Sequence, residues 1–340
     1  MLSYLTKLKN MKNATGFLFI GDPHLCSTRV GRRIDAPAVS TLDNLKQAAE
    51  ICKAKNLIPI CLGDLFHHSD DSKLWMMNRF SRIAKTFPLP MVVLGGNHDM
   101  AQTSLSEDDA LDLLGVTGVI QVISRSGLVG IYIIGDKKVA LSAWLHEDEI
   151  PDNIERPAGV DVHIVITHHD MAFGGSYPGA LPLKEIKGVD MLVNGHMHKT
   201  APSVTIGQTT LHNPGNINRL SVDVIDHEEA VWAWVPAQGL NLSKHVLEYE
   251  KDNVFNLTGI DIAEIGGKPV LASIVVKDLT HSRFAELMAA ESVGEASRSD
   301  DGSMLLEDLN VVMNESKISA GARALLERLA KESKKTEKLT

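Results

Sequence analysis

The sequence predicts a layered α/β fold, and three observations support this class. Short apolar runs rich in β-branched residues recur over the first two thirds of the chain, and turn-forming residues bound each run, so each is predicted to be a buried strand. Stretches with helical spacing lie between the first runs. Polar residues follow each run directly, at the edge where open α/β sheets bind ligands.

The predicted elements follow one another in a regular order. The main strands are FLFI at 17–20, LIPICL at 57–62, MVVLGG at 91–96, HIVIT at 163–167 and MLV at 191–193. Residues 38–55 and 72–86 are predicted helices, because apolar side chains such as Leu42, Leu45 and Ala49 recur at helical spacing. Four later runs have strand character and are expected to form a second sheet packed on the first: IYIIG, VALSAWL, AVWAWVP and HVLEYE.

The last quarter of the chain has a different pattern. We predict a main domain over 1–250 and a small unit over 251–290, which contains VLASIVVKD and a helical stretch. Residues 291–303, ESVGEASRSDDGS, have the composition of a linker. Residues 304–340 are predicted to be helical, with two apolar stripes.

Composition excludes several classes of protein. A formal charge of -9 disfavours a nucleic-acid binder that relies on overall basicity. The sequence has no apolar run near the roughly 18 residues that span a bilayer, and its first residues do not resemble a signal peptide. Three cysteines are an odd number without zinc-type spacing, which is typical of a reducing compartment. We therefore expect a cytoplasmic protein that does not bind membranes.

Metal-ligating residues follow the five main strands. Aspartate, asparagine and histidine together favour manganese, iron or zinc over calcium. Seven such ligands are too many for one ion, but two ions sharing one carboxylate would use them all and would hydrolyse a phosphoester without a covalent intermediate. The seven are Asp22, His24, Asp64, Asn97, His168, His196 and His198.

The ordered motifs DxH, GDxxH, GNHD, H and GHxH resemble those of the calcineurin-like metallophosphoesterase superfamily, over about residues 15–250. Within it, GDLFH, GNHD and PGNINR (214–219) resemble the SbcD-type DNA repair exonucleases. Protein Ser/Thr phosphatases carry GDxVDRG and GNHE, which this chain lacks. The resemblance implies a two-sheet αββα sandwich, a small α+β capping domain and a helical C-terminal tail.

The resemblance also implies a role for each site residue. One ion is assigned to Asp22, His24, Asp64 and His198, and the other to Asp64, Asn97, His168 and His196, with Asp64 bridging. His98 is expected to protonate the leaving oxygen, and Asp99 to orient His98. The fourth motif offers His168 or His169, and the ligand usually ends the strand directly, which favours His168. The native metal is expected to be Mn²⁺.

The function implied by the resemblance is metal-dependent DNA cleavage. The chain would be a 3′-to-5′ double-strand exonuclease and single-strand endonuclease, the catalytic subunit of an SbcC–SbcD-like ATPase–nuclease complex. Residues 304–340 would bind the coiled-coil ATPase, and the chain would form a homodimer in a bacterial or phage-infected cytoplasm. Candidate contacts to DNA phosphates are Arg29, Arg32, Arg33 and, more weakly, Arg219.

Other interpretations stay open at this point. The same metal site serves a small-substrate phosphodiesterase or phosphatase equally well. A DNA-end-binding scaffold with a structural metal site is a third possibility, although it has no physical need for the non-ligand His98. His67 completes the GDLFH motif and is either a residue that orients the site or a bystander. Cys26 is expected to be a packed thiol, and His146 an ordinary polar residue.

Overall fold

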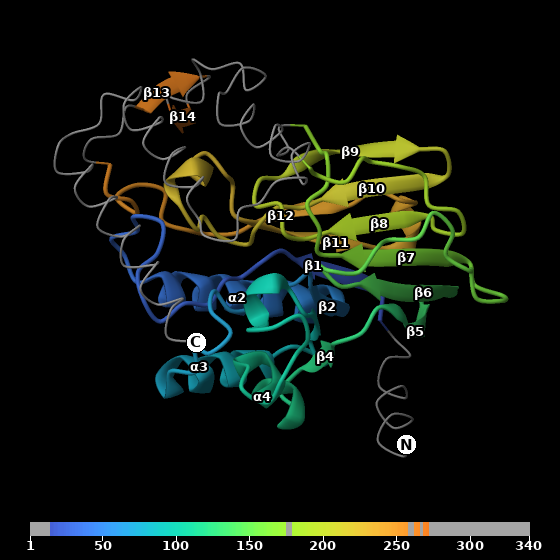
Figure 1. Cartoon of the computed structure of the whole chain (residues 1–340), viewed down its shortest axis with the longest axis horizontal. Coiled ribbons are helices and arrows are strands. Elements are labelled where there is room, and N and C mark those ends of the chain that lie inside the picture. Colours follow the sequence, from blue (N-terminus) through green and yellow to red (C-terminus); the bar gives the residue numbers. More distant parts are fainter. Residues whose placement is uncertain (1–13, 175–178, 258–261, 266–267, 272–340) are drawn as a thin grey trace, which may run out of the picture. The chain divides into compact units, whose positions relative to one another are not determined.

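The computed structural model describes residues 14–174, 179–257, 262–265 and 268–271 (Figure 1). The chain divides into two units, 1–277 and 278–340, and all described residues belong to the first. The predicted linker and tail therefore lie outside the described residues. In the small predicted unit, the described strands are β13 (Ile262–Ile265) and β14 (Lys268–Leu271), which pair antiparallel. Across the described part of the chain, no helix is both long and apolar enough to span a membrane.

The first sheet has six strands in the order β12-β11-β1-β2-β3-β4. Four of them run parallel: β1 (Gly16–Ile20), β2 (Leu57–Cys61), β3 (Val92–Leu94) and β4 (Gln121–Ile123). On the other side of β1, β11 (Ala230–Trp234) and β12 (Ser243–Val246) are antiparallel. The sheet thus joins the start of the chain to its 230–246 region.

The second sheet also has six strands, in the order β5-β6-β7-β8-β10-β9. Four are parallel: β6 (Lys137–Trp144), β7 (Val162–Thr167), β8 (Met191–Asn194) and β10 (Thr209–Asn213). The edge strands β5 (Gly127–Ile134) and β9 (Ala201–Ile206) are antiparallel. The two-sheet α/β fold is therefore confirmed.

The assignment of strands to sheets differs from the prediction in one respect. The runs AVWAWVP and HVLEYE were expected in the second sheet, but both lie in the first. AVWAWVP forms β11 beside β1, and the first two residues of HVLEYE lie in β12, which pairs with β11. The runs HIVIT and MLV, which carry two of the five motifs, lie in the second sheet as β7 and β8. The correction has a simple cause: apolar patterning identifies a buried strand but not its partner.

The two sheets pack face to face. In β1, Phe17 and Phe19 point into the layer between the sheets, where they meet Tyr132 of β5, Leu141 of β6 and other side chains of the second sheet. The alternate residues of β1 point to the opposite face, against the helices. Because β1 is buried on both faces, it has a continuous apolar sequence instead of an alternating one.

Three helices cover the outer face of the first sheet (Figure 1). They are α2 (Pro37–Lys55), α3 (Leu74–Ala84) and α4 (Ala110–Val116). Proline at the first turn favours the start of α2, and Asn56 ends it in the left-handed conformation. The outer face of the second sheet is covered differently, since Ile150, Ile154 and Phe173 of irregular segments pack there.

Candidate metal centre

The metal-ligand candidates of all five motifs meet at the carboxyl ends of the parallel strands. Asp22, Asp64 and Asn97 follow β1, β2 and β3 of the first sheet, whereas His168 and His196 follow β7 and β8 of the second. Among the described residues, four groups of side chains have ligand atoms within 4.8 Å of one another, His24–His67–His98 and His146–Asp170–His196 included. The other two groups consist of predicted ligands, and we call them the first and second cluster. The clusters are Asp22–His24–His198 and Asp64–His168–His196.

The first cluster matches the ligand set predicted for one ion. His24 Nε2 lies 3.2 Å from His198 Nε2 and 3.5 Å from Asp64 Oδ2. Asp22 and His24 are both 1% exposed, so the site is closed on the side of the first sheet. These contacts bring the predicted residues of this ion together.

The second cluster matches the set predicted for the other ion. His168 Nε2 lies 3.2 Å from Asp64 Oδ2, 3.2 Å from Asn97 Oδ1 and 3.3 Å from His196 Nδ1. The same oxygen, Asp64 Oδ2, is thus close to a histidine nitrogen of each cluster. This geometry supports Asp64 as the bridging ligand.

The spacing of these atoms fits bound cations. Two atoms that each lie about 2.1 Å from one ion are separated by roughly 3.0–3.4 Å, and all but one of the nitrogen and oxygen contacts above lie in this range; the exception is the 3.5 Å between His24 and Asp64. Both oxygens of Asp22, and Asp64 Oδ2, are also buried without a hydrogen-bond partner. Unpaired buried carboxylate oxygens are costly unless a cation compensates them. The residues therefore fit a pair of divalent ions.

The pKa values of two residues in these clusters also indicate that the site lacks positive charge. Burial raises the pKa of the Asp22 carboxyl to about 7. Although burial opposes a charged ring, the Asp64 carboxylate raises the pKa of His168 to about 10. The proton on His168 thus supplies a positive charge that a bound cation would replace.

The residue of the fourth motif that faces the cluster is His168, not His169. His168 Nδ1 lies 2.8 Å from the carbonyl oxygen of Leu62 and donates to it, which leaves Nε2 for a metal. His169 Nε2 instead lies 2.9 Å from the carbonyl oxygen of Asp148. The geometry supports the choice of the residue that ends the strand.

Strained backbone holds several of these ligands in place. His24, Asp64 and His196 have φ values of 43°, 46° and 68°, in the left-handed region that non-glycine residues rarely adopt. Each such residue costs of order 1–3 kcal/mol, and such strain concentrates at functional sites. Close packing adds to the constraint, since a Cβ at Gly63 would lie 2.2 Å from His168 Nδ1.

A family model described as calcineurin-like phosphoesterase matches residues 16–200, more than half of the chain. The chain belongs to the calcineurin-like phosphoesterase family. It is accordingly a metal-dependent phosphoester hydrolase of a family that uses two metal ions. A search of curated proteins gave no match.

Similar solved structures come from Thermus thermophilus. A 5′-nucleotidase precursor is 13% identical with a TM-score of 0.42, and the match covers 70% of this chain but only 55% of that one. The protein TT1561 is 11% identical with a TM-score of 0.39, covering 68% of this chain and 99% of that one. A hypothetical protein is 11% identical with a TM-score of 0.41, covering 69% and 99%. Similarity at this level says nothing about the substrate of this phosphoesterase.

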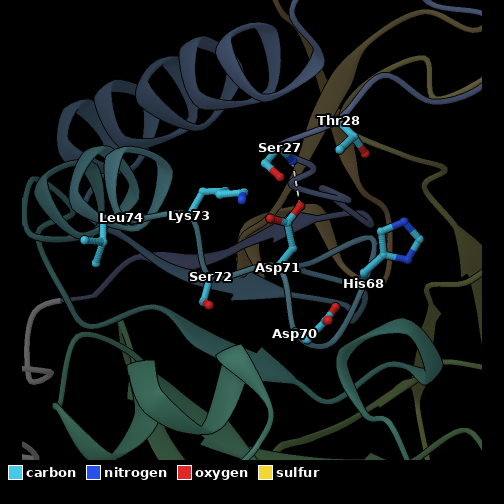
Figure 2. Close-up of a pocket in the computed structure, with 8 residues that line it drawn as sticks. All are labelled: Ser27, Thr28, His68, Asp70, Asp71, Ser72, Lys73 and Leu74. Carbon is cyan, nitrogen blue, oxygen red and sulfur yellow. Dashed lines mark hydrogen bonds between the residues drawn. The ribbon is translucent and has the colours of Figure 1, made fainter.

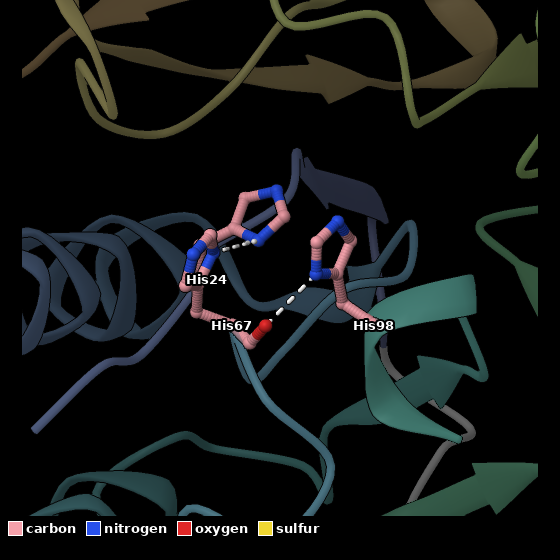
Figure 3. Close-up of side chains that lie close together, drawn as sticks. All are labelled: His24, His67 and His98. Carbon is pink, nitrogen blue, oxygen red and sulfur yellow. Dashed lines mark hydrogen bonds between the residues drawn. The ribbon is translucent and has the colours of Figure 1, made fainter. Parts of the chain in front are cut away.

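His98 lies beside the first cluster without belonging to the predicted ligand set (Figure 3). Its Nδ1 donates to the carbonyl oxygen of His67 over 2.8 Å, and its ring is stacked on the His67 ring with centroids 5.2 Å apart. The His98 amide donates to Asp64 Oδ1 over 2.9 Å. His67 therefore orients His98 through its backbone, and the remaining nitrogen of His98 is Nε2.

Asp99 has a different role from the one predicted. Its carboxylate accepts hydrogen bonds from the amides of Leu65, Phe66 and Gly96 at 3.2, 2.9 and 3.0 Å. These hydrogen bonds hold the GDLFH loop against the GNHD loop, and this is how Asp99 affects the site. The expected orientation of His98 by Asp99 is corrected, because the carbonyl of His67 does this instead.

Two of the four arginines predicted to contact DNA are buried and paired. Arg33 binds both oxygens of Asp35 and donates to the carbonyl oxygen of Arg219, 2.7 Å away. Arg219 pairs with Glu229 over 3.2 Å and donates to the carbonyl oxygens of Glu250 and Lys251. Contact with a phosphate would break these buried pairs, so we correct both assignments to structural roles.

Arg29 and Arg32 are exposed in the loop after the first motif, so their predicted contact with DNA stays a prediction. The PGNINR segment, which includes Arg219, fastens metal motifs together instead. The amide of Asn216 donates to the carbonyl oxygen of His198, and the amide of Ile217 donates to that of Gly21.

Two residues near the second cluster were missed from the sequence. Asp170 Oδ1 lies 3.3 Å from His196 Nε2, and the His146 ring lies 4.9 Å from the His196 ring. Asp170 directly follows His168 and His169 in the sequence, and this position next to a predicted metal motif could have identified it. His146 follows β6, a strand that carries none of the five motifs, so nothing in the sequence distinguished it from other histidines.

A pocket of about 480 Å³ is formed by residues that follow the DxH motif and residues that follow the GDLFH motif (Figure 2). His68, whose ring lies 4.5 Å from that of His67, lines it together with Ser27, Thr28, Asp70, Asp71, Ser72, Lys73 and Leu74. Asp71 accepts a hydrogen bond from the Ser27 amide over 2.6 Å, which closes one wall. The pocket offers hydroxyl, carboxylate and ammonium groups, and through His68 it adjoins His67.

Proposed function

We propose that this phosphoesterase is a DNA nuclease that acts on duplex ends. The observation that carries hydrolysis is His98, a histidine outside the predicted ligand set whose ring lies 5.0 Å from that of His24 and is held by a backbone hydrogen bond. The choice of DNA rests on the motifs. The SbcD-like form of the motifs, GDLFH, GNHD and PGNINR, favours DNA over other phosphodiesters. Exonuclease action from 3′ to 5′ on duplexes, and endonuclease action on single strands, belong to the same proposal.

Each residue of the site has its own role in the proposed reaction. Asp22, His24, Asp64 and His198 would hold one ion, and Asp64, Asn97, His168 and His196 the other. Two divalent ions, for which Mn²⁺ is proposed, would polarise the phosphoryl group and activate a water. His98 holds its Nδ1 proton against the His67 carbonyl, so its Nε2, when protonated, gives a proton to the leaving oxygen.

Partners are also part of the proposal. We place the SbcC-like ATPase on residues 304–340, and a homodimer is expected; neither the tail nor the rest of the 278–340 unit is among the described residues. Arg29 and Arg32 would guide the DNA backbone, with a local positive charge that offsets the net charge of -9.

A small-substrate phosphodiesterase is the second candidate, and one observation favours it. Asp70 and Asp71 line the pocket that adjoins His67, and their carboxylates would repel a continuing phosphate backbone there. A short neutral or cationic leaving group suits this pocket better than a polyanion.

The deciding experiment uses the purified chain with Mn²⁺ and linear duplex DNA labelled separately at each 3′ and 5′ end. We expect digestion that a chelator abolishes and that His98→Ala slows by roughly 10²–10⁴-fold, the usual contribution of a general acid. His98→Ala should still bind two equivalents of Mn²⁺, and His245→Ala, on the distant strand β12, should behave as wild type.

Other outcomes would contradict this proposal. Turnover of bis-p-nitrophenyl phosphate without digestion of any DNA, single-stranded DNA included, would favour the small-substrate enzyme. Loss of Mn²⁺ from His98→Ala would show that His98 is a ligand.

A further inference from the structure

We propose that Asp170 is a positioning residue, whose carboxylate orients His196 for metal binding through its close contact with the outer nitrogen of the ring. His196 Nε2 lies 3.3 Å from Asp170 Oδ1. This inference rests on the metal-ligand assignment above and does not depend on DNA being the substrate.

The two nitrogens of His196 face different partners. Nδ1 lies 3.3 Å from His168 Nε2 in the second cluster, whereas Nε2 faces Asp170. A neutral imidazole has one N–H and one lone pair, and an ionised carboxylate only accepts. The contact with Asp170 therefore puts the proton on Nε2 and directs the lone pair of Nδ1 toward the metal.

His196 needs such a partner more than His168 does. The His168 side chain is fully buried and donates to the Leu62 carbonyl oxygen over 2.8 Å. The His196 side chain is 19% exposed and begins from a strained backbone with φ of 68°. Since less packing holds this ring, the close contact with the Asp170 carboxylate decides more of its orientation.

The backbone around Asp170 is itself fixed. The Leu181 amide donates to the carbonyl oxygen of Asp170 over 2.8 Å. One residue earlier, the Asn194 side chain donates to the carbonyl oxygen of His169 over 2.9 Å. Asn194 ends β8, two residues before His196, so the same strand end sets the positions of the carboxylate and of the ring.

A third cation site is the competing explanation of this cluster. His146, Asp170 and His196 offer ligand atoms within 4.8 Å of one another. A third ion there would take the lone pair of Nε2, whereas the second cluster takes that of Nδ1. A neutral ring has only one lone pair of this kind, so the two uses exclude each other.

The test is a calorimetric titration of Mn²⁺ into chelator-stripped protein, without nucleic acid. We expect the wild type to bind two equivalents. Asp170→Ala should weaken one of them by roughly 10–100-fold, as is usual when the partner of a metal-bound histidine is lost, and leave the other unchanged. Asp170→Glu, which keeps a carboxylate, should recover most of the affinity. The Asp170 side chain is 47% exposed, so the fold should tolerate these changes, as thermal melting will check.

Glu147→Ala is the matched control. Its carboxylate lies 3.6 Å from His146 Nδ1 and is 67% exposed, so the variant removes a nearby negative charge without touching His196. We expect its Mn²⁺ affinities to stay within about twofold of the wild type, since an exposed charge has little effect in water.

Four results would overturn the proposal. Unchanged affinities in Asp170→Ala would show that the contact with the Asp170 carboxylate does not position His196, and an equal loss in Glu147→Ala would show a general charge effect. A third equivalent in the wild type that Asp170→Ala and His146→Ala both lose would establish the cation site instead. Fewer than two equivalents in the wild type would remove the ligand assignment itself, whatever the DNA assay shows.

Discussion

At the scale of single residues, the sequence predicted which candidate ligands meet better than it predicted the groups around them. Asp22, Asp64 and His168 each follow a recognisable strand, so motif spacing was sufficient to predict that the fold brings them together. The roles of Asp99 and Arg219 depend on which distant groups they contact, such as the Leu65 amide and the Glu229 carboxylate. Such contacts follow from tertiary structure, and no local pattern encodes them.

A buried histidine away from the metal ligands gives a prediction about pH. Burial lowers the pKa of His227 from 6.5 to about 4, and its Nε2 donates to the Asn216 carbonyl oxygen over 2.7 Å. The unfolded chain binds this proton near pH 6.5, whereas the folded chain does so only near pH 4. His227 therefore stabilises the fold fully above pH 6.5, and this contribution is lost as the pH falls toward 4.

The measurement is the free energy of unfolding of the metal-free protein at pH 7.5 and pH 5. His227→Gln keeps an N–H donor but does not titrate, so its stability should fall by about 2 kcal/mol less than that of the wild type between these pH values. His68→Gln, at an exposed histidine, should follow the wild type. Equal losses in His227→Gln and the wild type would mean that His227 does not titrate as described.

At the scale of elements, the strands were predictable but their partners were not. The apolar runs predicted where strands form, but they did not predict that β11 pairs with β1 across more than 200 residues of chain. Pairing at such separation depends on which faces pack together, and β1 and β11 share one inner layer through Phe17 and Trp234. Their rings are stacked with centroids 5.8 Å apart, and the local sequence around either residue does not predict this contact.

The turn between β2 and Asp64 gives a prediction at this scale. In Gly63→Ala the new methyl group would meet the His168 ring 2.2 Å away, at a φ of 120°. We expect the variant to bind one equivalent of Mn²⁺ less than the wild type, because the ring must leave its position next to Asp64. Elemental analysis of the dialysed protein measures this.

Gly127 is the matched control for backbone strain. Its φ is 127°, but nothing lies within 4 Å of an added Cβ. Gly127→Ala should lose about 1–2 kcal/mol of stability through strain alone and keep both metal equivalents. Equal metal content in the two variants would refute a steric role for Gly63.

At the scale of the whole molecule, the two clusters join the two sheets. Each cluster combines side chains that follow strands of the first sheet with side chains that follow strands of the second. Because the unfolded chain cannot assemble such a set, bound metal should stabilise the folded state.

Chelation tests this coupling. Mn²⁺ at about 100 times its Kd should add about 2.7 kcal/mol for one site, which raises the Tm by roughly 5–10 °C over protein in chelator. His98→Ala should keep this difference, and Asp64→Asn should lose most of it, since Asp64 Oδ2 lies between the clusters. A wild-type Tm that is the same with Mn²⁺ and with chelator would show that metal binding does not stabilise the folded state.

The order of the ligands along the chain has a consequence for biosynthesis. The first cluster needs both Asp22, just after the first strand, and His198, which follows β8. A growing polypeptide emerging from the ribosome therefore cannot capture an ion at this cluster until most of both sheets has been made. Metal loading would then be a late event that marks nearly completed folding, and chains interrupted before His198 would stay unloaded and inactive.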